Sequence, residues 1–114
     1  MHAGEFERGA GEFERALEID SGAALVHANL AIAMMNLRRW EHAEASARRA
    51  LRLDPSNHAA RYILGSLSLA RGECTPQAVE DLRAAAERYQ AARIALERAL
   101  ACRDANDKAG GWIK

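Results

Sequence analysis

Apolar residues recur at steps of three and four through the middle of the chain, which is the spacing of one face of a helix. Between Trp40 and Leu51 they form a single stripe, while Glu and Arg side chains occupy the other faces. This pattern predicts an amphipathic helix with one face toward water. The preceding segment, residues 24–37, has two neighbouring apolar stripes, which pass through Leu30 and Ile32. A helix that is apolar on most sides must be covered on most sides, so we expect it to lie between neighbours or to face a groove.

Short turns separate the expected helices, and no segment alternates as a strand does. Asp54-Pro55 and Thr75-Pro76 each place a side-chain oxygen ahead of a proline, a combination typical of the start of a helix. Gly72 marks the end of the helix that starts near Asn57. Because the turns are short, consecutive helices should pack antiparallel as hairpins.

The pattern repeats at a spacing of 34 residues. Phe6 recurs as Trp40, and Leu17 recurs as Leu51. After residue 65 the repeat shifts by one or two positions, and we expect insertions or deletions of this size to lie in turns. A fixed period of this size is typical of proteins that stack one helical unit on the next. Small residues at the repeated positions would let helix axes approach closely where they cross.

The repeated residues resemble the signature of the tetratricopeptide repeat (TPR) family, which is W-x2-L-G-x2-Y followed by A-x3-F and a proline. The clearest copy is His27-x2-Leu30-Ala31-x2-Met34, followed by Ala43-x3-Ala47, Ala50 and Pro55. The resemblance implies an all-α fold, a TPR-like α-solenoid of antiparallel helix pairs, with the whole chain, 1–114, as a single array. The expected units are a half-repeat at 4–21, repeats at 22–55 and 56–88, and a weak partial repeat at 90–114.

The last unit departs from the family pattern. Glu97 stands where a small residue is expected, and no proline or glycine lies between Pro76 and Asp104. We favour a break at residues 88–90, with one continuous helix over 76–104 as the alternative. The incomplete units at both ends lead us to expect a piece of a longer array, or else ends that pair with a second copy of the chain.

Charge and composition narrow the function classes. Sixteen basic and sixteen acidic side chains balance, so the strongly basic character of a general nucleic-acid binder is missing. The longest apolar run is too short and too polar to span a bilayer, and the first residues do not resemble a signal peptide. We therefore expect a cytoplasmic protein that does not bind a membrane. A weaker alternative is that an Arg-rich segment, residues 38–52, binds an anionic surface or nucleic acid. This alternative predicts that the binding affinity falls steeply as the salt concentration rises.

No catalytic arrangement is found in the sequence. Ser66 lacks the second glycine of a nucleophile elbow, and His42 has no second histidine at metal-ligand spacing. Cys74 and Cys102 form no CxxC pair, and two thiols do not make a disulfide scaffold. We therefore expect no enzyme, no metal and no cofactor.

The resemblance instead implies a surface that binds another protein. In this family the first helices of successive repeats line a concave channel that holds a peptide. We expect a non-catalytic protein-protein interaction module that binds a partner peptide or helix there, with Asn29 and Asn36 bonding to the peptide backbone. One alternative is that these residues only pack on an adjacent helix; another is that the chain is a structural spacer or self-association segment of a larger TPR protein. The residues carried over to the channel are Leu25, Ala28, Asn29, Ile32, Met35, Asn36, Tyr62, Ser66, Leu69, Ile94 and Arg98.

Overall fold

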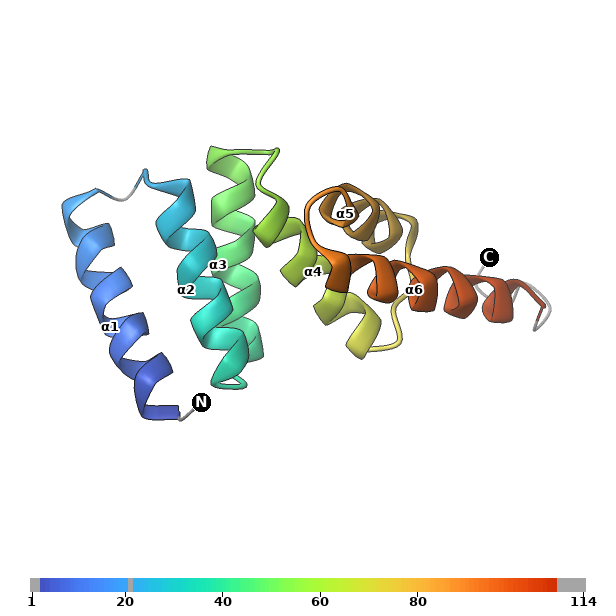
Figure 1. Cartoon of the computed structure of the whole chain (residues 1–114), viewed down its shortest axis with the longest axis horizontal. Coiled ribbons are helices and arrows are strands. Elements are labelled where there is room, and N and C mark those ends of the chain that lie inside the picture. Colours follow the sequence, from blue (N-terminus) through green and yellow to red (C-terminus); the bar gives the residue numbers. More distant parts are fainter. Residues whose placement is uncertain (1–2, 21, 109–114) are drawn as a thin grey trace.

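The computed structural model describes residues 3–20 and 22–108. Within these ranges the chain forms six α-helices, which follow one another along a molecule of 50 × 29 × 25 Å, with α1 and α6 at opposite ends (Figure 1). The predicted all-α array is confirmed. The helices are α1 (Ala3–Ile19), α2 (Ala24–Asn36), α3 (Trp40–Leu53), α4 (His58–Ala70), α5 (Pro76–Ala86) and α6 (Gln90–Lys108).

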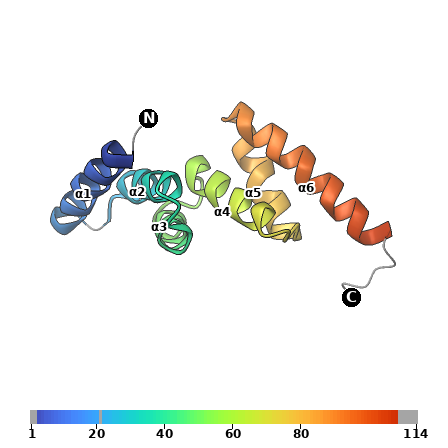
Figure 2. The same cartoon turned by 90° about the horizontal axis from the view of Figure 1, so that it is seen from below.

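The helices pack as successive antiparallel neighbours. The α2 helix packs on α3 and α4 packs on α5, while α1 flanks α2 and α6 flanks α5. In addition α2 contacts α4, and α4 contacts α6, so every second helix lies along one side of the array. In the view from below, α3 lies beneath α2, whereas α4 follows α2 along the array (Figure 2). This arrangement gives α2, α4 and α6 a common face.

Side chains cap two of the helices. The Thr75 hydroxyl accepts a hydrogen bond of 3.1 Å from the backbone N–H of Ala78, and Pro76 is the first residue of α5, as predicted. The Asn57 side chain accepts one of 2.9 Å from the N–H of Ala60 at the start of α4. Gly72 follows α4 with a φ of +77°, a left-handed conformation that glycine adopts without steric cost.

The prediction that Asp54-Pro55 begins a helix is wrong. Asp54 instead ends α3, and its carboxylate accepts hydrogen bonds from the hydroxyl and the backbone N–H of Ser56, at 2.7 and 3.1 Å. These bonds close a local turn and lower the pKa of Asp54, the hydroxyl bond having the larger effect. Because this turn uses the Asp54 oxygen, α4 starts at His58 with Asn57 as its N-cap, which confirms the predicted start near Asn57.

The region between Pro76 and Asp104 contains two helices, so the single continuous helix is ruled out. The α5 helix ends at Ala86 and α6 begins at Gln90. The backbone N–H groups of Arg88 and Tyr89 both donate to the carbonyl of Ala85, which closes the turn. The Arg93 guanidinium donates to the carbonyl of Ala86 at 3.3 Å and so satisfies one of the last carbonyls of α5. The end of the predicted unit 90–114, from residue 109, lies outside the described residues, as does residue 21.

Most of the buried apolar side chains in the described ranges are alanines. Ala43, Ala47 and Ala50 of α3 are fully buried, and Gly65 of α4 is buried against Leu82 of α5. Small side chains of this kind allow close helix crossings, as the spacing predicted. The buried apolar side chains form two clusters, one that extends from α1 to α4 and one around Val79, Leu82 and Ala99. Partly buried residues pack against the second cluster, namely Tyr62, Leu69, Ala95, Leu96 and Leu100.

Ion pairs connect neighbouring helices. Arg61 of α4 donates to the buried carboxylate of Asp81 in α5 at 2.8 Å. Glu44 of α3 accepts from Arg48 on its own helix at 2.7 Å and from Arg71, just beyond α4, at 2.9 Å. These two arginines, Arg48 before Arg71, lower the pKa of Glu44, and Glu44 in turn raises the pKa of Arg71.

Candidate binding groove

Two hollows lie side by side on the face shared by α2, α4 and α6. The first, of about 340 Å³, is lined by α2, α4, the turn before α6 and the start of α6. The second, of about 500 Å³, is lined by α4 and α6. We call the two hollows together the groove. The first is lined by Ile32, Met35, Asn36, Ala59, Tyr62, Ile63, Tyr89 and Ala91, and the second by Tyr62, Ser66, Leu69, Ala70, Ala91, Ile94, Ala95 and Arg98.

Tyr62 lines both hollows, as does Ala91. The Tyr62 ring lies 6.0 Å from the ring of Tyr89, centroid to centroid, at an angle of 38°. Aromatic pairs at this separation stabilise each other and resist displacement. The turn between α5 and α6 thus packs against α4, and its residue Tyr89 lines the first hollow.

The structure brings most of the predicted channel residues together. Ile32, Met35 and Asn36 lie in the first hollow; Ser66, Leu69, Ile94 and Arg98 lie in the second. The α2 helix supplies the first group and α4 and α6 supply the second, as expected if α2, α4 and α6 are the first helices of their units. Whether these residues bind a partner stays a prediction.

The other predicted channel residues lie elsewhere. Ala28 is fully buried, so this prediction is wrong: the methyl group packs inside the array, where a ligand does not reach it. Leu25 is exposed and Asn29 half-buried, and neither lines the two hollows. Both residues precede the part of α2 that lines the groove, which begins at Ile32.

The Asn36 amide makes a bond that the sequence did not reveal. Its Nδ2 donates to the carbonyl of Ile32, one turn earlier, at 2.9 Å. This bond holds the side chain along its own helix and orients the amide. The second N–H of Nδ2 and the side-chain carbonyl oxygen stay available for the expected contact with a peptide backbone.

The Ser66 hydroxyl is buried without a hydrogen-bond partner. Ser66 lines the second hollow, and it also lines a third hollow of about 560 Å³ beside the turn between α2 and α3. That third hollow contains Trp40, which is 44% exposed, with Met35 and Leu67. The sequence pattern placed Trp40 in the apolar stripe of its helix, and in the structure it is the first residue of α3.

Charged side chains occupy the opposite side of α4. A hollow of about 480 Å³ between α3, α4 and α5 is lined by Arg48, Arg52, Arg61 and Arg71, but also by Glu44, Glu73 and Asp81. Carboxylates bind three of these arginines, as described above. Arg39, from the Arg-rich segment 38–52, pairs with Glu7 of α1. Much of the positive charge in this region is therefore neutralised within the array.

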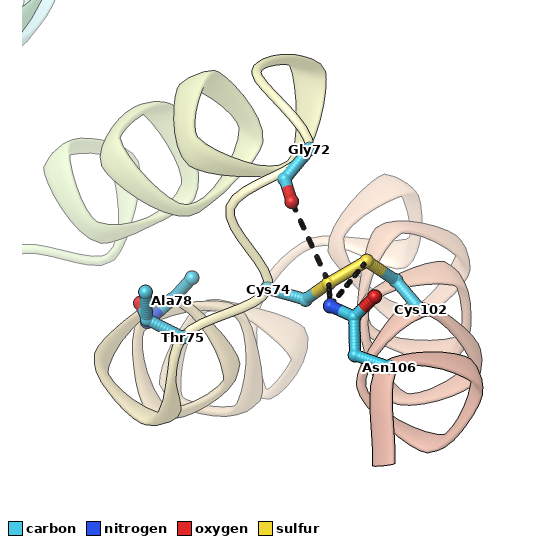
Figure 3. Close-up of a disulfide and its surroundings, with 6 residues drawn as sticks. All are labelled: Gly72, Cys74, Thr75, Ala78, Cys102 and Asn106. Carbon is cyan, nitrogen blue, oxygen red and sulfur yellow. Dashed lines mark hydrogen bonds between the residues drawn. A yellow bond between two sulfur atoms is a disulfide. The ribbon is translucent and has the colours of Figure 1, made fainter. Parts of the chain in front are cut away.

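Cys74 and Cys102 form a disulfide, a pairing that the residue spacing did not predict (Figure 3). Their Cα atoms are 6.0 Å apart, although 28 positions separate them along the chain. The turn between α4 and α5 lies beside the later half of α6, and this proximity arises from the stacking of the helices. Residue spacing alone contains no sign of it.

No group of three or more His, Cys, Asp or Glu side chains in residues 3–20 and 22–108 is placed to hold a metal ion. Among the helices of the same ranges, none has the length and apolar character needed to cross a membrane.

Comparison with known proteins agrees with the helix arrangement. Residues 24–57, which contain α2 and α3, match the family model described as tetratricopeptide repeat. No curated protein matches the chain.

Proposed function

Because the chain fits a repeat protein of the tetratricopeptide family, we propose that it is a non-catalytic module that binds a peptide or helix of a partner protein in the groove. Proteins built from these repeats commonly act as protein-interaction modules. The observation that carries the proposal is the pair of apolar hollows on the shared face of α2, α4 and α6.

The groove exposes large apolar side chains to solvent. Ile32 in the first hollow is 41% exposed and Ile94 in the second is 52% exposed. Burial of such side chains under a partner releases water and is the main favourable contribution to association. Met35 lies beside Ile32, and its unbranched side chain adapts to differently shaped partners.

The two hollows of the groove specify the kind of partner. A segment that lies along the groove would place one apolar side chain in each hollow. Arg98, exposed on α6, stands in the second hollow and favours an acidic side chain next to the second apolar residue. The proposed ligand is therefore a segment with two apolar side chains followed by a carboxylate.

A peptide library displayed on phage tests this proposal, with the full chain as the immobilised target. We expect enrichment of peptides with two apolar residues, and we expect the Kd of a synthetic copy to rise at least about tenfold in Ile32→Asp and in Ile94→Asp. Ile19→Asp is the matched control, because Ile19 is 89% exposed on α1 and lies outside the groove.

Circular dichroism of each variant separates binding from folding. Loss of affinity with unchanged helix content supports the groove. Equal affinity in all three variants, or a library that yields no binder, would contradict it. If Ile32→Asp and Ile94→Asp lose helix content, these side chains serve packing, and the chain is better described as a structural segment.

A further inference from the structure

The disulfide lies where it fixes a part of α6 that other contacts leave weakly held. Along α6 the apolar packing against α4 and α5 runs through Ala95, Leu96 and Ala99 to Leu100. Beyond Leu100 none of residues 101–106 is buried. The later half of α6 extends past α5, away from the rest of the array (Figure 2). Cys102 is the residue that joins this segment to the preceding turn.

The two sulfur atoms differ in accessibility. Cys74 is buried, with 8% of its surface exposed, whereas Cys102 is half-buried. A dissolved thiol therefore reaches Sγ of Cys102 first, and Cys74 is the leaving sulfur. Thiol–disulfide exchange depends on this choice of the attacked sulfur and on the stability of the leaving thiolate.

Asn106 is placed to stabilise that leaving sulfur. Its Nδ2 donates toward Sγ of Cys74 at 3.4 Å and lies 4.0 Å from Sγ of Cys102 (Figure 3). Negative charge on Cys74 therefore has an N–H donor at hand. Once protonated, the Cys74 thiol has the carbonyl of Gly72 as an acceptor, 3.8 Å from the sulfur.

We propose that Cys74 and Cys102 form a thiol–disulfide exchange site, which reacts with small thiols of the glutathione class and controls whether the end of α6 is fixed to the array. The thiolate of one small thiol attacks Sγ of Cys102; the bond between the cysteines breaks, and its electron pair and a proton from water go to Cys74. The thiolate of a second small thiol then attacks the sulfur of the first small thiol in the mixed disulfide. The bond to Cys102 breaks, and Cys102 takes up a proton and leaves as a thiol. Two small thiols are thus oxidised to their disulfide, and the two cysteines are reduced.

Reduction should release the end of α6 while the rest of the array stays folded. Ile94 and Arg98, which line the second hollow, lie on the same helix within a few turns of Cys102. Release of the helix end therefore loosens one wall of the groove; this last consequence rests on the proposed function, whereas the exchange site does not.

The test uses the full chain in glutathione buffers of graded ratio, with alkylation and intact mass to count free thiols, and hydrogen exchange to follow the helices. We expect both thiols to become free under native conditions. Amide exchange in residues 101–108 should then accelerate at least about tenfold, while α2 and α3 keep their protection. Oxidised glutathione should restore the slow exchange.

Reduction that requires a denaturant would overturn the proposal, and so would equal exchange rates in the oxidised and reduced chain. The variant with Cys74→Ser and Cys102→Ser should show the fast exchange at residues 101–108 whatever the buffer. Since the reversible measurement on the natural chain needs no substitution, the proposal stays testable even if this variant unfolds.

Asn106→Leu tests the role of the amide. It keeps both cysteines but removes the donor, so we expect the disulfide to form and its reduction by glutathione to slow by about threefold or more. Asp104→Ala is the control, because Asp104 is exposed on the same helix. An unchanged rate in Asn106→Leu would remove Asn106 from the proposal, and a rate that rises would contradict the assignment of Cys74 as the leaving sulfur.

Discussion

Gly65 of α4 lies so close to Leu82 of α5 that a Cβ atom on residue 65 would stand 2.6 Å from Cγ of Leu82. The same atom would stand 3.3 Å from the carbonyl oxygen of Ala78, which is backbone and has little freedom to move. The two helices thus cross at a point where only a hydrogen atom fits.

We expect Gly65→Ala to lower the free energy of unfolding by about 1–2 kcal/mol. Overpacking costs about 1–3 kcal/mol, and it outweighs the gain of up to about 1 kcal/mol that alanine brings to a helix. Urea denaturation followed by circular dichroism measures the difference. The matched control is Gly11→Ala in α1, where the nearest atom is the end of the Arg15 side chain at 4.0 Å; this variant should be more stable than the natural chain. If both variants were stabilised, the crossing would have room that the structure does not show.

Removing either partner of the Arg61–Asp81 pair should destabilise the fold, but by different amounts. The Asp81 carboxylate is buried and the Arg61 side chain is 26% exposed, so Arg61→Met leaves a buried charge with only Gln77 as donor, at 3.1 Å. We expect a loss of about 3 kcal/mol in the free energy of unfolding.

Asp81→Asn should cost less, about 1 kcal/mol. Arg61 still reaches water and keeps its hydrogen bond of 3.0 Å to the carbonyl of Pro55. Urea denaturation at neutral pH compares the two variants. A greater loss in Asp81→Asn than in Arg61→Met would show that burial of the carboxylate is not the dominant cost.

The ion pairs of Glu44 predict that the free energy of unfolding depends on pH. Arg48 and Arg71 hold the pKa of Glu44 below its ordinary value of 4.5 in the folded chain. A carboxyl group of this kind stabilises the fold above the pKa of the unfolded chain, and the contribution is lost as the pH falls through the lower, folded pKa.

Glu44→Gln should therefore lower the free energy of unfolding at neutral pH, by up to about 1 kcal/mol. The difference from the natural chain should shrink as the pH is lowered below 4.5. Urea denaturation over a pH series measures it. Glu97→Gln, exposed on α6, should stay close to the natural chain throughout. A constant difference between Glu44→Gln and the natural chain at every pH would contradict the ion-pair explanation.

The disulfide predicts a difference in stability between the oxidised and the reduced chain. It closes a loop whose ends are 28 positions apart, and a cross-link of this length stabilises a fold by about 2–4 kcal/mol, chiefly by restricting the unfolded chain. A reducing agent should lower the Tm of the natural chain and leave that of Cys74→Ala with Cys102→Ala unchanged. Equal Tm values with and without reductant would indicate that the thiols are unpaired in solution.

Local patterns predicted the helices because the periodicity and the caps act over a few residues. The stripe through Ala43, Ala47 and Ala50 and the cap at Thr75 needed no knowledge of distant contacts. Asp54 was assigned wrongly because its carboxylate can accept either from the first N–H groups of a helix or from a residue in a local turn. In this chain Ser56 donates to it, and the turn forms.

The site was less predictable, since it depends on how helices stack. Ile32 and Met35 were identified from their stripe, but Ala28 on the same stripe is buried because its neighbours approach closely there. Tyr89 and Ala91 line the groove only because the chain turns between α5 and α6. The bond from Cys74 to Cys102 likewise follows from the position of α6 beside an earlier turn, and no local signal specifies it.

The predominance of alanine in the interior has a consequence for how this chain tolerates mutation. Replacing a buried alanine with glycine costs about 1 kcal/mol in helix propensity, whereas adding a larger side chain to a filled interior costs about 1–3 kcal/mol. The buried positions of α3 should therefore tolerate glycine better than valine or leucine. Variation among natural versions of the chain would then concentrate on the outward faces, where new side chains change the surface without altering the separation of the helices.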